Sequence, residues 1–151
     1  MAERCVLDTS AILAVWEDEE GSNDVKDLLN KAARGEIEIF LSFMTFFEAY
    51  YVTKREEGES KAFEIYYWLY SLPTERVNLE EDILIKAGDV KVKYAKYDVS
   101  VADAWIIATA LFKDATLIHK EEREDKGMNV IKDLPIPIIR IPRDLEGREK
   151  V

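Results

Sequence analysis

Four carboxylates stand beside apolar segments of the chain and could do chemistry together: Asp8, Glu48, Asp103 and Glu121. Carboxylates that converge without enough Lys or Arg repel one another, and their pKa values rise. A hard divalent cation such as Mg²⁺ or Mn²⁺ removes this conflict, because it prefers oxygen ligands. Such a site activates water and stabilises in-line displacement at a phosphate. The four acids therefore predict metal-assisted phosphoryl chemistry, although the chain has 31 acids and spacing alone does not establish it.

A simpler role is open to each of these acids taken alone. Asp8 precedes a helical pattern and can cap its N-terminus. Glu48 lies at the margin of an apolar helical face, where a half-desolvated carboxylate needs either a metal or a salt bridge to a lysine. Ser100 and Asp103 fit the capping-box pattern, and Glu121 belongs to a charged run typical of a solvated loop. The metal hypothesis therefore rests on where the acids fall relative to one another.

Strands and helices alternate along the chain, and they must bring the acids together. Residue patterns predict strands at residues 4–7, 36–41, 75–78, 115–119 and 136–141. They predict helices at residues 11–16, 22–34, 42–55, 60–72, 80–97 and 101–112. This order indicates one α/β domain over residues 1–141, with a parallel sheet between helices on both faces and a charged tail at 142–151. In such a sheet ligands bind beyond the carboxyl ends of the strands, where Asp8 falls.

The predicted helix over residues 60–72 is dense in aromatic side chains: Phe63, Tyr66, Tyr67, Trp68 and Tyr70. Aromatic residues at helical spacing more often belong to a core or an interface than to a platform for bases. Because these side chains occupy more than one face of the helix, we predict a subunit interface here.

Composition and charge narrow the classes of function. The chain has 151 residues, of which 48% are hydrophobic, and its net charge of −10 argues against loose, non-specific binding of nucleic acid. The charge does not exclude a nucleic-acid enzyme whose acids bind metal, and it suits a basic protein partner. The lack of a membrane-length apolar run or a signal-peptide pattern, together with the lone Cys5, points to the cytoplasm. The absence of Gln and the abundance of Glu, Lys and Ile resemble the hyperthermophile pattern and predict high thermal stability.

Four blocks of the sequence resemble the PIN-domain ribonucleases, most closely the VapC-type toxins. The blocks cover residues 6–10 (VLDTS), 41–48 (LSFMTFFE), 100–110 (SVADAWIIATA) and 115–121 (ATLIHKE), in the family's order. The third block is quite specific, whereas the first and second are generic when taken alone. The resemblance implies a Rossmann-like, three-layer fold with a mainly parallel five-stranded sheet and a Mg²⁺ or Mn²⁺ site. It also implies cleavage of RNA to a 5′-phosphate and a 3′-hydroxyl and, commonly, a homodimer.

The matching positions carry the family's functional residues onto this chain. The resemblance implies that three acids hold the metal and catalyse the reaction: Asp8, Glu48 and Asp103. Thr9 or Ser10, and also Ser100, would support the site by hydrogen bonding. The fourth acid of the family is usually Asp, whereas Glu121 stands there, and the aromatic residue expected shortly after it is missing. Glu121 can still reach a metal or orient a water as the fourth catalytic acid, or Asp125 can take its place.

Contacts with RNA and with a protein partner follow from the same hypothesis. Lys93 and Lys96, just upstream of Ser100, are our prediction for contacts to RNA, although an ordinary solvated helix face explains them as well. His119, the only histidine, is predicted to be a structural group. If the protein is a toxin, a separate antitoxin would keep it inactive, for instance by inserting a basic side chain among the acids.

Three other functions remain open. The same fold also serves RNA processing outside toxin–antitoxin systems. A non-catalytic PIN-like scaffold for RNA or protein would bind metal without turnover. An aspartyl-phosphate enzyme would use Asp8 as its nucleophile. A phosphatase of the haloacid-dehalogenase type, however, needs a second acid where Ser10 stands, and a receiver needs paired acids at the end of its first strand.

Overall fold

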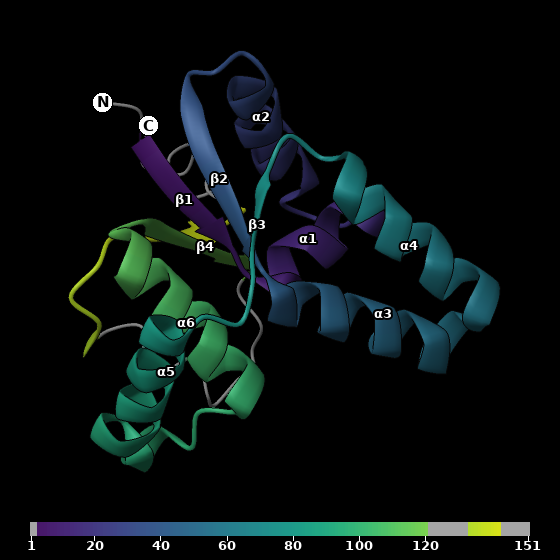
Figure 1. Ribbon diagram of the computed structural model, residues 1–151. Helices are drawn as coiled ribbons and strands as arrows, with labels where there is room; N and C mark the ends of the chain where they lie inside the picture. Colours follow the sequence, from purple (N-terminus) through teal and green to yellow (C-terminus); the bar gives the residue numbers. More distant parts are fainter. Residues whose placement is uncertain (1–2, 121–132, 143–151) are drawn as a thin grey trace.

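The computed structural model describes residues 3–120 and 133–142, and within these ranges it contains one sheet of five parallel strands (Figure 1). The strands are β1 (Glu3–Leu7), β2 (Ile37–Ser42), β3 (Glu75–Val77), β4 (Thr116–Lys120) and β5 (Ile138–Ile141). Their order in the sheet is β3-β2-β1-β4-β5. Because the chain moves to one side of β1 for β2 and to the other side for β4, the carboxyl end of β1 is the topological switch point, where ligands bind in open α/β sheets.

The helices of the described ranges lie in two layers, one against each face of the sheet (Figure 1). They are α1 (Thr9–Trp16), α2 (Ser22–Ala33), α3 (Phe43–Glu57), α4 (Glu59–Ser71), α5 (Glu81–Lys93), the short 3-10 helix η1 (Ala95–Tyr97) and α6 (Val101–Lys113). Val6 belongs to the core under α5 and α6, whereas its neighbours Cys5 and Leu7 belong to the core under α1 to α4. This alternation follows from the strand geometry, in which successive side chains point to opposite faces. The predicted three-layer α/β fold is confirmed.

Helices α3 and α4 form a hairpin that extends away from the sheet (Figure 1). They are joined at Gly58, whose φ of +95° lies in a region that glycine adopts without steric cost. The hairpin carries five exposed aromatic side chains, which we call the aromatic ridge: Phe47, Tyr51, Phe63, Tyr67 and Tyr70. The predicted subunit interface in this region remains a prediction.

The expected helix over residues 80–97 is shorter in the structure, where α5 ends at Lys93 and η1 follows. Tyr94 and Val99 both enter the core under α5 and α6, so the chain must turn between them. Asp98 makes this turn with a left-handed φ of +53°. The apolar residues keep a helical spacing up to this turn, so the sequence pattern predicted a helix that is longer than the one in the structure. Among the described helices, none is long and apolar enough to cross a membrane.

Candidate active site

Asp8 is the first residue beyond β1 and is only 5% exposed. Its backbone N–H donates to the Ile118 carbonyl at 2.8 Å, so the sheet holds the main chain at this point. Asp8 occupies the N-cap position of α1, yet its side chain makes no capping hydrogen bond. Instead, the Ser10 hydroxyl donates to Asp8 Oδ2 at 2.6 Å. Helix capping therefore does not account for the carboxylate.

Ser10 connects Asp8 to the end of the neighbouring strand. Its hydroxyl accepts from the backbone N–H of Lys120, the last residue of β4, at 2.9 Å while it donates to Asp8. Lys120 Nζ pairs with Glu19 at 3.3 Å. The predicted supporting role of Ser10 therefore has a definite geometry, in which one hydroxyl links two strand ends. Glu121 and Asp125 lie outside the described residues.

Thr9 makes the corresponding link to Glu48. Its hydroxyl donates to Glu48 Oε1 at 2.6 Å and lies 3.3 Å from Thr45 Oγ1. Thr9 and Thr45 are both buried, whereas Glu48 is half-buried. Thr45 did not stand out in the sequence, although its place three residues before Glu48 puts both on one side of α3. Two consecutive hydroxyl residues, Thr9 and Ser10, thus each hold a different carboxylate.

The start of α3 is fixed by Ser42, as the sequence predicts. The Ser42 hydroxyl accepts from the backbone N–H of Met44 at 3.1 Å, which satisfies one of the open donors at the helix end. Because α3 begins directly at the carboxyl end of β2, Glu48 stands less than two turns from the sheet edge. The position of Glu48 near Asp8 is therefore a consequence of the strand-to-helix junction.

Asp103 approaches the same edge from the first turn of α6. The Ser100 hydroxyl accepts from the Asp103 backbone N–H at 3.1 Å and caps the helix. An edge-to-face contact between Phe43 and Trp105, with ring centroids 5.0 Å apart, packs the first residue of α3 against the second turn of α6. Asp103 itself is half-buried. Ser100 thus caps the start of α6, and its supporting role at a catalytic site remains a prediction.

The donor chemistry of these side chains fits a hard divalent cation, because carboxylate and hydroxyl oxygens are the ligands that Mg²⁺ and Mn²⁺ prefer. Within the described residues, no three His, Cys, Asp or Glu side chains lie close enough together to hold a metal ion by themselves. Mg²⁺ commonly binds through one or two carboxylates, with water and substrate phosphate completing its shell. Asp8, which is hydrogen-bonded to Ser10, and Glu48, which is hydrogen-bonded to Thr9, suit a site of this kind with two carboxylates.

Residues 5–126 of the chain match the family model of the PIN domain. The chain belongs to the PIN domain family. Its fold is similar to solved toxin–antitoxin structures, among them VapBC2 from Rickettsia felis bound to a DNA fragment of its promoter (15% identity, 91% of this chain and 98% of that chain covered, TM-score 0.70). It is also similar to VapBC-5 from Mycobacterium tuberculosis (15% identity, 91% of this chain and 98% of that chain covered, TM-score 0.62). A third similar structure is the sarcin–ricin loop cleaving toxin VapC20 from the same organism (16% identity, 75% of this chain and 86% of that chain covered, TM-score 0.60). No curated protein matches the sequence.

The predicted RNA contacts of this PIN domain lie on its surface. Lys93 and Lys96 are exposed, and their ammonium groups stand 5.5 Å from the ring centroid of Tyr94 and 5.0 Å from that of Tyr97, respectively. Their role toward RNA remains a prediction. His119 is buried, with Nδ1 3.2 Å from the Lys120 carbonyl oxygen, in keeping with a structural group.

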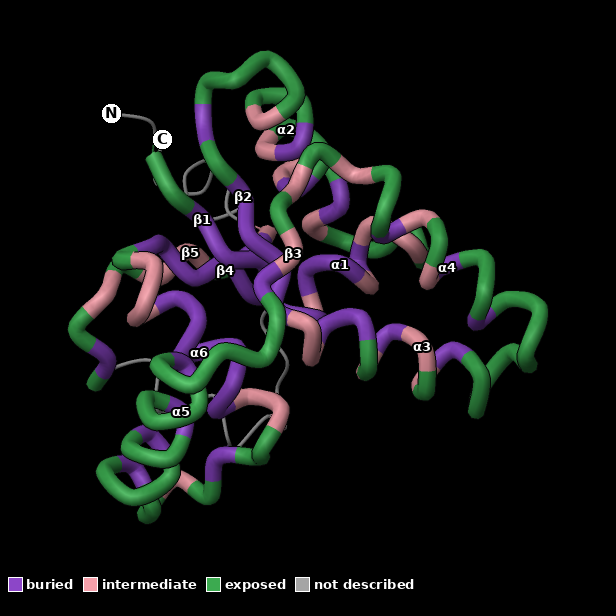
Figure 2. Tube along the Cα trace, viewed as in Figure 1, coloured by how far each residue is buried: buried purple, intermediate pink, exposed green. Residues whose placement is uncertain are grey.

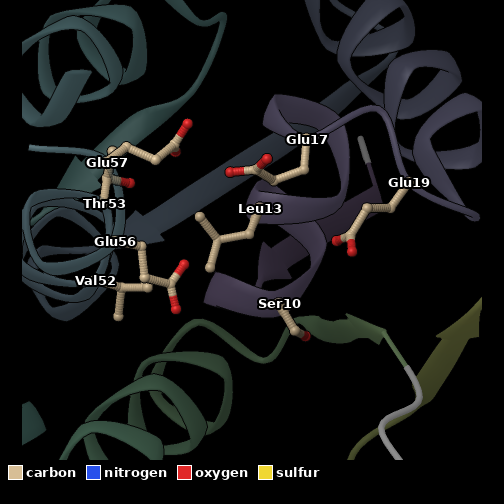
Figure 3. A pocket seen from close by; sticks show the side chains of 8 residues that line it. All are labelled: Ser10, Leu13, Glu17, Glu19, Val52, Thr53, Glu56 and Glu57. Atoms are coloured by element: carbon tan, nitrogen blue, oxygen red, sulfur yellow. The ribbon is translucent and has the colours of Figure 1, made fainter.

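A pocket of about 660 Å³ opens between α1 and α3 of the PIN domain (Figure 3). We call it the acidic pocket, and it is lined by Ser10, Leu13, Glu17, Glu19, Val52, Thr53, Glu56 and Glu57. Figure 3 shows the carboxylates of Glu17 and Glu56 turned into the space between the two helices. The pKa of Glu17 is raised by desolvation and then by the charge of Glu57 and a hydrogen bond with it. Since Ser10 lines this pocket and binds Asp8, the pocket adjoins the candidate site.

Proposed function

We propose that this PIN domain is a Mg²⁺- or Mn²⁺-dependent endoribonuclease that hydrolyses RNA phosphodiester bonds, and that it acts in the cytoplasm as the toxin of a toxin–antitoxin pair. The observation that carries the proposal is the pair of hydroxyl–carboxylate bonds at the switch point of the sheet, Ser10 to Asp8 and Thr9 to Glu48, each 2.6 Å long. The PIN family match and the fold of VapC20, described as a toxin that cleaves the sarcin–ricin loop, support it.

Each side chain has a distinct part in the proposed reaction. Asp8 and Glu48 would hold the cation directly, and Asp103, with Glu121 as a fourth acid, would complete its shell through bound water. When bound, the cation supplies a Lewis acid that neutralises charge on the phosphate and lowers the pKa of water. Thr9 and Ser10 hold two of the carboxylates in fixed positions, so little reorganisation accompanies substrate binding. Burial of Asp8 excludes bulk water from the site and strengthens its attraction for a cation.

The direct test is cleavage of a mixed, structured RNA by the purified chain with Mn²⁺. We expect cutting that EDTA prevents and that Asp8→Asn and Glu48→Gln each abolish. Asp27→Asn is the matched control, because Asp27 is an exposed acid of α2 away from the site, and it should cut like the wild type. Cutting by Asp8→Asn at the wild-type rate would refute the assignment of the site.

A non-catalytic PIN-like scaffold is the second candidate. It is favoured by the lack of a three-residue metal cluster among the described side chains and by Glu in place of the usual fourth Asp at position 121. In that case Mn²⁺ would raise the melting temperature of the wild type but not of Asp8→Asn, and no RNA would be cut. An RNA-processing nuclease outside toxin–antitoxin systems would cut RNA without a neighbouring gene for an inhibitor.

We propose that the inhibitory partner places a basic side chain in the acidic pocket. Four glutamates line this space; Lys120 pairs with Glu19, and a cation from outside would relieve the remaining repulsion around Glu17. The similar structures from Rickettsia felis and Mycobacterium tuberculosis are toxin–antitoxin complexes by their description. Glu56→Lys should weaken inhibition by the protein encoded next to this gene and leave RNA cleavage intact. Glu59→Lys, an exposed acid outside the pocket, is the control.

Two further parts of the proposal concern contacts outside the site. Lys93 and Lys96 would bind phosphates of the RNA, so reversing both charges should weaken RNA binding and reduce its salt dependence. Unchanged binding would remove them from the RNA contact. The protein would also be a homodimer, as the resemblance to the family implies.

A further inference from the structure

Helix α3 carries two exposed aromatic side chains of the aromatic ridge next to the candidate active site. Phe47 directly precedes Glu48 and is 58% exposed, and Tyr51 is 40% exposed. Their ring centroids lie 5.2 Å apart, with an interplanar angle of 44°. Exposed positions recur along this helix toward the far end of the hairpin (Figure 2). Two large rings are therefore open to solvent close to a carboxylate of the site.

Tyr51 lies on the same side of α3 as Glu48. Residues three and seven positions apart share one side of an α-helix, because each turn has 3.6 residues. Tyr51 and Arg55 follow Glu48 at these spacings, so they stand about one and two turns farther from the sheet. The guanidinium of Arg55 lies 5.7 Å from the ring centroid of Tyr51. A carboxylate, an aromatic ring and a positive charge thus form a row that leads away from the candidate site.

This row is separate from the acidic pocket. Helix α3 contributes two glutamates to the lining of that pocket, whereas Tyr51 and Arg55 do not line it. Arg55 pairs with Glu56 at 3.6 Å, but both side chains are exposed, and a surface ion pair of this kind contributes little. A phosphate can therefore take the place of Glu56. A polyanion near α3 is repelled on the side of the pocket and attracted on the side of Arg55.

We propose that Tyr51, flanked by Phe47, stacks on a base of the RNA next to the cleaved phosphate, and that Arg55 binds the adjoining phosphate. Every base has a π-face, so this contact binds RNA without reading its sequence. A paired base is covered by its neighbours in a helix, so the contact favours loops and ends. The inference rests on the proposed nuclease function, since it places the RNA strand relative to Glu48. The aromatic side chains of α4 are left for the predicted subunit interface.

A short single-stranded RNA that contains 2-aminopurine tests the stacking, because the fluorescence of this base is quenched when it stacks. The background is Asp8→Asn, which should bind RNA without cutting it. We expect quenching that persists in Tyr51→Phe and is lost in Tyr51→Leu, which keeps an apolar side chain but has no π-face. Tyr51→Leu should also weaken RNA binding about tenfold. Tyr67→Leu, at an exposed aromatic position of α4, is the matched control and should quench like its parent. Full quenching by Tyr51→Leu would overturn the proposal.

The salt dependence of RNA binding tests the charge at the end of the row. Arg55→Met should weaken binding and reduce the slope of log Kd against log salt concentration by about 0.7, the value for one phosphate of a single strand. Lys54→Met removes the same charge from the adjacent residue, whose ammonium lies over Tyr50 instead, and it should leave the slope unchanged. Equal slopes for Arg55→Met and the wild type would remove Arg55 from the contact.

These measurements fail separately from the test of the nuclease. RNA cleavage that depends on Asp8, combined with unchanged quenching in Tyr51→Leu, would keep the proposed function and reject the stacking contact. Quenching that depends on Tyr51, without cleavage by the wild type, would support the stacking contact and refute the nuclease. A change in sedimentation or in inhibition by a protein partner, with RNA binding intact in Tyr51→Leu, would assign the ring to a protein contact and overturn the proposal.

Discussion

The Thr9 hydroxyl donates to Glu48 Oε1 at 2.6 Å, although 39 residues separate the two in sequence. Thr9 follows β1 and Glu48 follows β2, and these two strands are parallel neighbours in the sheet. Their carboxyl ends therefore meet at one edge, and each is continued by a helix that starts at once. The bond joins the first turn of α1 to the second turn of α3, so it ties together two helices of the same layer beside the candidate site.

Removal of this hydroxyl should cost activity more than stability. Thr9→Val keeps the shape of the side chain but no longer holds Glu48. A hydrogen bond to a charged group contributes about 1.5–3 kcal/mol, so we expect a fall in kcat/KM of roughly 10–100-fold. Thr9→Ser retains the donor and should stay within about threefold of the wild type. RNA cleavage with Mn²⁺ measures both, and full activity of Thr9→Val would show that this bond does not organise the site.

Neutralisation of Asp8 should separate metal binding from folding. Without metal, Asp8→Asn should melt at or slightly above the wild-type temperature, because a buried charge is lost while the shape is kept. Mn²⁺ at about one hundred times its Kd should raise the melting temperature of the wild type by about 5–10 °C. It should leave Asp8→Asn unchanged. An equal rise in both proteins, measured by calorimetry with an EDTA blank, would place the cation elsewhere.

The fold could be predicted from the sequence because its signals are local and regular. Strands covered on both faces read as short apolar runs, as in residues 39–41, and parallel strands require helical crossovers between them. Asp8, Ser42 and Ser100 mark strand ends or helix starts, so their places followed from the same signals. The proline-rich approach to the last strand indicated an edge position, which β5 occupies.

The partners of the site residues could not be predicted, because they depend on side-chain directions across different elements. Ser100 and Asp103 fit the capping-box pattern, which predicted a helix cap at Ser100, and the structure contains this cap. The same reasoning made Asp8 a helix cap, whereas its carboxylate is bound by Ser10. The contact of Thr45 with Thr9 could not be predicted, because a threonine in an apolar helix usually belongs to the hydrophobic core.

The acidic pocket predicts a pH-dependent stability. Because desolvation, with Glu57 next, raises the pKa of Glu17 above its ordinary value of 4.5, the ionised form is disfavoured in the folded state. This cost is present at neutral pH and disappears as the pH falls through the raised pKa. Glu17→Gln should therefore raise the melting temperature at about pH 7.5 by about 1–2 °C, the scale of exposed charge pairs. The gain should vanish near pH 4.5.

The control for this prediction is Glu20→Gln, an exposed acid of the same loop that does not line the pocket. Its melting temperature should follow that of the wild type at every pH. A gain from Glu17→Gln that persists unchanged at low pH would mean that the ionisation of Glu17 is not its source.

High thermal stability is predicted from composition. The chain lacks Gln, has a single Cys and is rich in Glu and Lys, and these features accompany ion-pair networks and fewer thermolabile residues in proteins from hot environments. The metal-free protein should melt above the mesophile range of about 45–65 °C. Scanning calorimetry at two scan rates measures it, and a midpoint inside that range would contradict the prediction.

The identity of the fourth acid can be decided by comparing two positions. Glu121 directly follows β4, whose last residue, Lys120, is bound to Ser10 through its backbone N–H, whereas Asp125 comes four residues later. If Glu121 acts at the site, Glu121→Gln should lower kcat roughly 10–100-fold, the usual effect of losing a group that tunes a metal site. Glu121→Asp should keep or raise activity, because it restores the family's usual residue, and Asp125→Asn should change little. Titration with Mn²⁺ adds a readout independent of folding, since loss of a ligand raises the concentration needed for half-maximal rate. The reverse pattern, with Asp125→Asn impaired and Glu121→Gln active, would assign the fourth position to Asp125.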